Sequence, residues 1–323
     1  MSYLTIAIPT FQRAKYLDIC LASLEKNMPQ TIQNDIEVLV IDNNSQDNTA
    51  EIIAKHQVSM SIRYIRNKEN IGPDENFKKC ITEATSQYVW IFGDDDVFFP
   101  STLENIIDIL KSKKNIGLIH LRAKNFYNDA EILDYHVQAF SCIHMASKEN
   151  FVEKIHTNIT FISANIVNKE ILLKTMDLKD IPNNNLGQMY WNIICILKSD
   201  LNIFVTNEAF GARQFNSGSY NLCEVFGKNF IDMLYFINLK YPISSFIEIY
   251  IKRLLMFYLP ANIVRIRNGL SKVECKGCFK ILYTKYKFRI YFWIFTVPAM
   301  ILPKKIALLI VKQIEIILKK KNP

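Results

Sequence analysis

Three consecutive aspartates are the strongest chemical signal in this chain of 323 residues. Asp94, Asp95 and Asp96 follow Gly93 and the apolar, aromatic segment 88–92. Adjacent carboxylates repel one another unless a cation or hydrogen-bond donors compensate. Clustered carboxylate oxygens suit Mg²⁺ or Mn²⁺, ions that commonly bridge to phosphate oxygens. An acidic turn capping the next helix is the alternative, but one or two aspartates would be enough for that role. We therefore favour a site for metal and phosphate.

Two further polar clusters also follow apolar runs. Pro9 and Thr10 come after the run 4–8, and Asp42 with its two asparagine neighbours comes after the run 36–41. Asp42 has two interpretations, which the sequence leaves open. It could open a turn, or it could accept a hydrogen bond from a nucleobase or ribose.

The elements that must position these clusters alternate between strands and helices. Short apolar, β-rich runs predict strands at 4–8, 36–41, 62–65, 88–92 and 116–121. Apolar residues at helical spacing predict helices at 14–27, 48–54, 77–84 and 101–110, the last beginning with a capping box formed by Ser101 and Glu104. This alternation predicts an α/β fold with a mostly parallel sheet between helices. All three polar clusters would lie at the carboxyl ends of strands, where such sheets bind ligands.

Taken together, four segments resemble family-two glycosyltransferases of the GT-A (Rossmann-like) fold. They are I-A-I-P-T-F-Q-R-A-K-Y-L (6–17), V-L-V-I-D-N-N-S-Q-D-N-T (38–49), N-I-G-P-D-E-N-F (70–77) and V-W-I-F-G-D-D-D (89–96). The resemblance is specific over residues 3–125 and weaker as far as 220. The N-I-G-P-x-x-N-F motif is most similar to that of enzymes that build bacterial O-antigen and capsule.

The resemblance implies a role for each matching position. Asp96 would hold Mg²⁺ or Mn²⁺ on the diphosphate, and Asp42 would bond the base. The positions expected to contact the nucleotide or its sugar are Pro9, Thr10, Arg13, Asp42, Asn44, Asn70, Gly72, Asp94 and Asp95. A metal ion there would neutralise charge on the departing nucleoside diphosphate.

The sequence departs from the family pattern at the catalytic base. Many relatives carry an acidic pair about 90 residues after the aspartate motif, and its carboxylate deprotonates the acceptor hydroxyl. The matching stretch here, 182–191, contains no carboxylate. Asp180 and Asp200 are the nearest carboxylates, so the base is unassigned, with Asp180 as the candidate. Inversion at the sugar is an expectation from the family alone.

An arginine follows the predicted strand 203–206. Arg213 lies in the stretch 211–219, whose glycine, serine and asparagine content predicts a mobile loop. Arg213 could clamp the diphosphate of a bound donor, or it could be a solvated surface residue.

The last quarter of the chain has a different composition. Residues 1–240 hold 23 Lys and Arg against 28 Asp and Glu, whereas residues 241–323 hold 16 against 3, which together give the net charge of +8. The apolar run 288–302, interrupted by Pro298, is short for a bilayer span, and a second apolar stretch covers 306–318. Basic residues beside apolar faces predict helices lying on an anionic membrane. A packed helical subdomain with a basic surface is the alternative, and no nucleic-acid motif is present.

Seven cysteines at irregular spacings do not suggest a disulfide framework. Cys275 and Cys278 form a lone C-x-x-C without a second pair of ligands, so we expect ordinary thiols there rather than a zinc site. The start of the chain shows no secretory signal pattern. We expect a cytoplasmic protein on the inner face of the cell membrane.

These observations predict a metal-dependent glycosyltransferase. Residues 1–220 would form the GT-A domain, with a nucleotide-sugar half (1–125) and an acceptor half (126–220), and residues 221–323 a helical, basic, membrane-peripheral region. It would move a sugar from a nucleotide-sugar donor to a hydroxyl of a lipid-linked or cell-surface glycan. Two alternatives are a sugar nucleotidyltransferase, which the absence of glycine from 9–13 argues against, and a non-catalytic scaffold.

Overall fold

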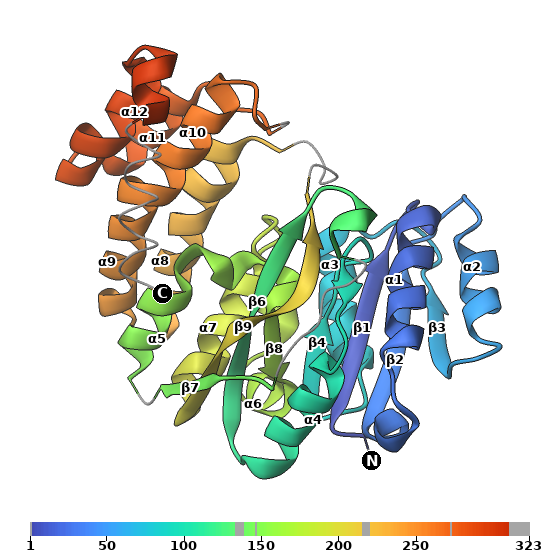
Figure 1. Ribbon diagram of the computed structural model, residues 1–323. Helices are drawn as coiled ribbons and strands as arrows, with labels where there is room; N and C mark the ends of the chain where they lie inside the picture. The colour runs from blue at the N-terminus through green and yellow to red at the C-terminus, as the bar shows by residue number, and fades with distance from the viewer. Residues whose placement is uncertain (1, 133–138, 146, 215–219, 272, 310–323) are drawn as a thin grey trace. The chain divides into compact units, whose positions relative to one another are not determined.

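The computed structural model describes residues 2–132, 139–145, 147–214, 220–271 and 273–309 (Figure 1). The chain forms two compact units. Unit 1 comprises residues 1–151 and 158–216, and unit 2 comprises residues 152–157 and 217–323.

Unit 1 is built on one mixed sheet with the strand order β3-β2-β1-β4-β8-β6-β9-β5, and β7 pairs with β9. Its strands are β1 (Leu4–Thr10), β2 (Ile36–Asp42), β3 (Ile62–Arg66), β4 (Tyr88–Ile91), β5 (Val97–Phe98), β6 (Ile116–Phe126), β7 (Cys142–Met145), β8 (Asn165–Asn168) and β9 (Leu201–Arg213). The strands β3, β2, β1 and β4 are parallel. Strand β8 runs antiparallel to both β4 and β6. The predicted α/β class is confirmed, and the parallel pairs are those among β3, β2, β1 and β4 together with the pair of β6 and β9.

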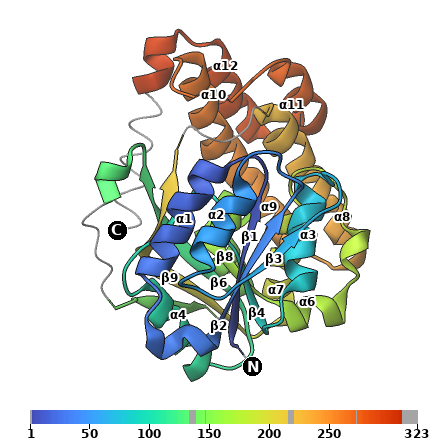
Figure 2. The same ribbon diagram turned by 90° about the vertical axis from the view of Figure 1, so that its right-hand side faces the viewer.

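Helices cover both faces of this sheet. In Figure 2, α1 and α2 lie on one side of the strands, and α3, α6 and α7 lie on the other. The helices of unit 1 are α1 (Ala14–Lys26), α2 (Thr49–His56), α3 (Pro73–Glu83), α4 (Thr102–Ser112), α6 (Lys169–Thr175) and α7 (Gly187–Lys198), and α5 (Lys148–Ile155) extends into unit 2. The arrangement explains why β1 and β2 are almost wholly apolar, since both of their faces are buried.

Two local predictions need correction. Ser101 does precede α4, but its side chain makes no capping hydrogen bond, so the capping box with Glu104 is wrong. The reason is its left-handed backbone (φ 61°), whereas a capping serine needs an extended conformation. The strand predicted at 203–206 continues to Arg213 as β9, because Gly211 pairs with Val97 of β5.

An aromatic cluster supports the segment that carries the aspartates. The Trp90 ring lies edge-on to Phe92 and Phe98, with centroids 4.9 and 5.4 Å away, and Phe210 of β9 closes the group. Trp90 Nε1 donates to Ser163 O at 2.7 Å, so the buried indole has its polar partner. Close packing of this kind gives the following residues a fixed position.

Unit 2 is helical. Its elements are a π-helix η6 (Cys223–Asn229), α8 (Phe230–Lys240), α9 (Ser244–Arg253), a π-helix η7 (Leu254–Tyr258), α10 (Leu259–Arg267), α11 (Cys278–Tyr286), a π-helix η8 (Phe292–Thr296) and α12 (Val297–Ile301). Among the described residues, none of the helices combines the length and apolar character needed to cross a bilayer. Of the second apolar stretch, 306–318, only residues 306–309 lie among the described residues.

Pro298 does not interrupt the apolar run as the sequence predicted. Residues 290–301 form one continuous helix, with the π-helical segment η8 just before Pro298. Val297 N donates to Phe292 O, five residues back. This wider turn accommodates a residue that has no N–H and would clash in a regular helix.

Candidate functional site

The strand order reverses between β1 and β4, which makes their carboxyl ends the switch point of the sheet. Ligands of open α/β sheets bind at this position. Thr10 ends β1, and its Oγ1 donates to Asp94 Oδ2 at 2.7 Å across the switch point. Pro9 lies in β1 beside Ile41, one residue before the register pair Thr10 and Asp42. The structure therefore brings the predicted polar clusters to one edge.

Arg13 holds two of the three aspartates. Its Nη1 donates to Asp94 Oδ1 at 2.8 Å, and its Nη2 donates to Asp95 Oδ2 at 3.0 Å. Arg13 immediately precedes α1, so the short turn after β1 is what aims it at the aspartates. Its side chain keeps 29% of its surface exposed, which leaves the guanidinium open to a solvent-borne anion.

Arg213 approaches the same aspartates from the end of β9. Its backbone N donates to Asp96 Oδ1 at 3.1 Å, and its Nε donates to Asp95 O at 3.2 Å. Its Nη2 pairs with Asp129 at 2.7 Å, and the guanidinium lies 4.6 Å from the centroid of the Phe126 ring. Arg213 is therefore not a solvated surface residue.

Burial disfavours the charged form of two of these carboxyl groups. Asp94 and Asp96 are each 3% exposed. Burial, opposed by Arg13, raises the pKa of Asp94 to about 6. Burial and the neighbouring Asp95 raise the pKa of Asp96 further above its ordinary value. Two buried carboxylates that resist ionisation, with the carboxylate of Asp95 beside them, fit a hard divalent cation such as Mg²⁺ or Mn²⁺.

Replacing Asp94 with asparagine is expected to change how stability depends on pH in metal-free buffer. The folded protein keeps a proton on Asp94 up to about pH 6, whereas the unfolded chain releases it near the ordinary value of 3.8. The folded state therefore binds more protons in this window, so this group makes the protein less stable as pH rises. The shift corresponds to about 3 kcal/mol at most.

The variant should therefore gain about 2 kcal/mol relative to the unmodified protein between about pH 4 and pH 7. Denaturant unfolding curves in EDTA at each pH measure the difference between the two proteins. A difference that stays constant across this range contradicts the raised pKa.

Asp42 is 1% exposed and already has two donors. Its Oδ1 accepts from Ser45 N and its Oδ2 accepts from Tyr64 Oη, both at 2.8 Å. Burial and this bond raise the pKa of Tyr64 to about 12. Asp42 thus fixes the turn after β2, as the turn interpretation expected, and its bond to a nucleobase stays a prediction.

Asn43 ties the turn after β2 to the loop before α3. Its Nδ2 donates to Asn70 Oδ1 at 2.8 Å, and its Oδ1 accepts from Ile71 N at 2.9 Å. Asn70 Oδ1 also accepts from Gly72 N, whose left-handed backbone (φ 81°) suits glycine. Asn44, also left-handed, accepts from Arg66 at 3.3 Å. The predicted base and ribose residues therefore form one connected rim.

The loop before α7 is anchored to α3, a connection for which the sequence contains no local signal. Asp74 Oδ2 accepts from Asn185 N at 2.8 Å, and Lys78 Nζ donates to Ile181 O at 2.8 Å and Asn183 Oδ1 at 2.9 Å. Asp180, exposed, ends the short 3-10 helix 178–180 just before this loop. Its role as base stays a prediction.

Sequence reasoning also missed two residues that contact the aspartate segment. Ser163 Oγ accepts from Gly93 N at 2.9 Å, and Asp129 is the outer partner of Arg213. Neither lies in a recognisable motif. Only the packing of distant segments against the turn 93–96 brings them there.

Comparison with known proteins decides the family. The sequence profile of glycosyl transferase family 2 matches residues 5–174, more than half of the chain. The chain belongs to glycosyl transferase family 2. The predicted resemblance is confirmed. The matched region contains the polar residues at the ends of β1, β2 and β4 and in the loop before α3, which we call the switch-point rim: Thr10, Asp42, Asn43, Asn44, Asn70, Asp94, Asp95 and Asp96.

Curated relatives of this family 2 chain match only in part. Abequosyltransferase RfbV of Salmonella typhimurium is 36% identical over 117 residues, covering 36% of this chain and 34% of that protein. The Campylobacter jejuni GalNAc(5)-diNAcBac-PP-undecaprenol beta-1,3-glucosyltransferase is 28% identical over 123 residues, covering 38% and 37%. The chain thus spans about a third of the length of these relatives.

A solved structure extends the family 2 likeness to the fold. S. aureus TarS 1–349 in complex with UDP gives a TM-score of 0.60 at 14% identity, covering 92% of this chain and 91% of that chain. The same protein in complex with UDP-GlcNAc gives a TM-score of 0.56 at 15% identity, covering 92% and 81%. These likenesses confirm the predicted GT-A fold.

Proposed function

We propose that this family 2 chain transfers a sugar from a nucleotide-sugar donor to a hydroxyl of a lipid-linked or cell-surface glycan, with inversion at the sugar. The observation that carries the proposal is the switch-point cluster, where Thr10, Arg13 and Arg213 surround Asp94–Asp96. It offers carboxylate oxygens for a cation and two guanidinium groups for a diphosphate, which are the groups a nucleotide-sugar site needs.

The names of the relatives support the donor and acceptor classes. The TarS structures hold UDP and UDP-GlcNAc in the same fold. The Campylobacter relative is named for a glycan on undecaprenyl diphosphate, and the Salmonella relative is named for transfer of abequose. A glycan on a lipid carrier is therefore the acceptor class that we propose.

Asp96 is the residue that we propose for holding Mg²⁺ or Mn²⁺, with Asp94 and Asp95 beside it. When bound, the ion would supply Lewis-acid stabilisation of charge on the leaving diphosphate. Asp96 Oδ1 already accepts from Arg213 N, which orients the carboxylate before any ligand enters. Asp94 is held by Thr10 and Arg13, so it can orient Arg13 as well as reach the ribose or sugar.

The two arginines would exchange partners when a donor binds. Arg13 now pairs with Asp94 and Asp95, and Arg213 pairs with Asp129. Arg13 would be released from Asp94 and Asp95 once their charge is neutralised, which would free its guanidinium N–H groups for phosphate oxygens. Arg213 would reach the phosphates by giving up its exposed partner Asp129. Guanidinium groups bind phosphate through two parallel hydrogen bonds, which suits them to the departing diphosphate.

The loop before α7 would form the part of the site that receives the acceptor. Its anchoring by Asp74 and Lys78 gives it one position relative to α3. Asp180 is our candidate for the base that takes the proton of the acceptor hydroxyl. If Asp180 is the base, Asp180→Asn should lose sugar transfer, whereas Asp200→Asn, at another exposed aspartate, should keep it.

We propose that exposed residues of the segment 287–305 form one surface of unit 2, which makes peripheral contact with an anionic membrane on the inner face of the cell membrane. We call it the apolar-basic surface. Phe288 is 91% exposed, Ile290 is 62% exposed and Ile301 is 69% exposed. Lys287 lies 5.0 Å from the centroid of the Phe288 ring. Lys304 and Lys305 begin the next helical segment, 304–309, and both are exposed. Apolar side chains flanked by lysines fit an interface with anionic headgroups.

Product formation tests the proposed activity. The protein is incubated with radiolabelled nucleotide sugars, one at a time, and with bacterial membranes that hold lipid-linked glycans, in Mn²⁺ or in EDTA. We expect one donor to put label into the lipid extract in Mn²⁺ and little in EDTA. Formation of a nucleotide sugar from a sugar phosphate would instead support a nucleotidyltransferase, and binding without turnover of any donor would support the scaffold.

A further inference from the structure

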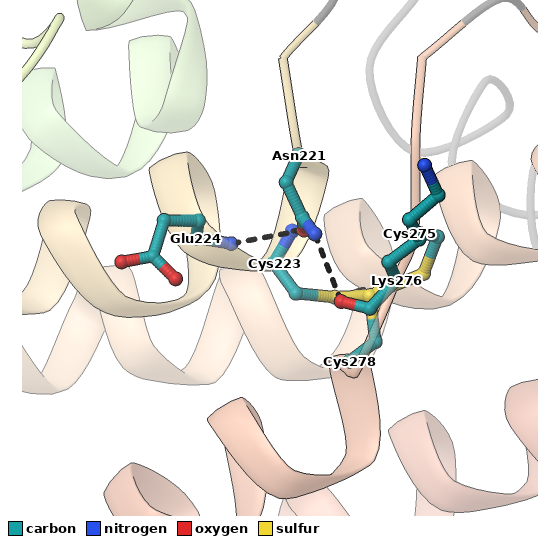
Figure 3. Close-up of a disulfide and its surroundings, with 6 residues drawn as sticks. All are labelled: Asn221, Cys223, Glu224, Cys275, Lys276 and Cys278. Carbon is teal, nitrogen blue, oxygen red and sulfur yellow. Dashed lines mark hydrogen bonds between the residues drawn. A yellow bond between two sulfur atoms is a disulfide. The ribbon is translucent and has the colours of Figure 1, made fainter.

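Three cysteines of unit 2 converge on one point. Cys223 and Cys275 each lie within bonding reach of Cys278, with Cα–Cα distances of 5.3 and 5.7 Å to it (Figure 3). Cys223 Sγ and Cys275 Sγ are 3.8 Å apart. A sulfur atom can form only one disulfide at a time, so no disulfide pairing uses all three. The sequence showed only the pair at 275 and 278, and folding adds the third sulfur.

The backbone around these cysteines is fixed by bonds that do not involve sulfur. Leu222 N donates to Glu274 O at 2.9 Å, and Glu274 N donates to Tyr220 O at 3.1 Å. Asn221 Nδ2 donates to Lys276 O at 2.8 Å, and its Oδ1 accepts from Cys223 N at 3.0 Å. These bonds place the start of η6 against the turn that carries the other two sulfurs. These bonds would therefore hold the three sulfurs together whether or not two of them are joined in a disulfide.

Helix starts and a glycine turn favour thiolates at this point. Cys278 is the first residue of α11, and Cys223 is the second residue of the helix 222–240. The helix dipole places partial positive charge at a helix start, and this charge stabilises negative charge on sulfur. Gly277, with φ 64°, makes the tight turn between Cys275 and Cys278, a backbone conformation that other residues rarely adopt.

The geometry points to a zinc site formed by Cys223, Cys275 and Cys278. Zn²⁺ binds thiolates at about 2.3 Å in a tetrahedral arrangement. That geometry sets sulfurs about 3.8 Å apart, which is the separation of Cys223 and Cys275. The three sulfurs are the whole set of His, Cys, Asp or Glu ligand atoms that meet here among the described residues.

The fourth ligand would be a water molecule from solvent. Cys275 is partly exposed, and Cys275 and Cys278 line a surface cavity of about 720 Å³ together with Lys276 and Lys280. Three thiolates and one Zn²⁺ leave a charge of −1. Lys280 and Arg267 also line the cavity and carry positive charge, whereas Lys276 pairs with Glu274 at 3.1 Å. The site joins segments 52 and 55 residues apart in the chain, so the ion stabilises unit 2.

Metal content of the full chain tests this inference. We expect about one Zn²⁺ per chain, by elemental analysis, after purification in reductant without chelator. Replacement by Co²⁺ should give thiolate-to-cobalt charge-transfer bands. Cys223→Ser should bind zinc at least about 100-fold more weakly, because a ligand lost costs more than the 10- to 100-fold effect of a lost supporting residue. Cys142→Ser, at a half-exposed cysteine of unit 1, should keep its zinc.

A second measurement covers the case in which Cys223→Ser does not fold. A zinc chelator should lower the unfolding temperature of the unmodified protein, and added Zn²⁺ should restore it. Two results overturn the inference. One is a chain without zinc whose unfolding temperature ignores the chelator. The other is a Cys278 disulfide, found by peptide mapping of protein kept under its native redox conditions.

Discussion

Exchange of Asp96 for asparagine should lower kcat/KM for sugar transfer by about 1000-fold or more, with the fold intact. A bound cation at such a site supplies several kcal/mol of transition-state stabilisation, and about 4 kcal/mol corresponds to that factor. Asparagine keeps the shape and can still accept from Arg213 N, so the loss would report the missing charge. Initial rates in Mn²⁺ at donor concentrations well below KM measure the effect.

The matched control for this change is Asp200→Asn. Asp200 is an exposed aspartate just before β9 and lies outside the switch-point rim. The control should keep its activity within about two-fold, since surface changes of this kind alter stability by less than about 0.5 kcal/mol. Activity of the Asp96 variant close to that of the control would remove the metal-holding role from Asp96. Circular dichroism and unfolding temperature establish that both variants fold.

The second large effect concerns the apolar-basic surface. A double variant, Phe288→Ser with Ile290→Ser, should bind vesicles of phosphatidylglycerol and phosphatidylethanolamine about 100-fold more weakly than the unmodified chain. Each side chain contributes about 1.5–3 kcal/mol when fully withdrawn from water. The partial withdrawal expected at a headgroup interface leaves about 3 kcal/mol for the pair, which is about 100-fold. Sedimentation with vesicles at varied lipid concentration gives the partition coefficient.

Two comparisons show whether the lipid contact is specific. Leu239→Ser changes a residue of α8 that is 86% exposed but is not part of this surface, and it should not alter vesicle binding. Lys304→Glu with Lys305→Glu should weaken binding to the anionic vesicles and leave weak binding to phosphatidylcholine unchanged, because each lysine adds about 1 kcal/mol near an anionic surface. Equal vesicle binding by the double serine variant and the unmodified chain would refute the membrane contact.

The sequence predicted the first four strands of the sheet well. Strands β1, β2 and β4 were visible as short apolar runs because both of their faces are covered. Strand β3 lies at the edge of the sheet and is only partly buried, and its short β-rich run was enough to predict it. The polar residues that end them were visible for the same reason, since Thr10, Asp42 and Asp94 interrupt otherwise continuous apolar segments. In these strands the local sequence pattern therefore also marks the position of the candidate site.

The rest of the site depends on contacts between distant segments. Ser163 reaches Gly93 across 70 residues, and the contact of Arg213 with Asp95 spans 118. Cys223 meets Cys275 across 52 residues. Periodicity along the chain carries no information on such pairs. Ser101 shows the converse limit, since its spacing with Glu104 suggested a cap that its left-handed backbone does not allow.

Calorimetric titration of nucleoside diphosphates into the full chain tests the central claim most directly. The titrations use UDP, GDP, CDP and dTDP, each in Mn²⁺ and in EDTA, with the unmodified protein and the Asp96→Asn variant. We predict that one diphosphate binds at least about 10-fold more tightly in Mn²⁺ than in EDTA, a coupling of about 1.4 kcal/mol, and that the Asp96→Asn variant loses this difference. The account is contradicted if none of the four binds, or if the variant binds as tightly in Mn²⁺ as the unmodified protein.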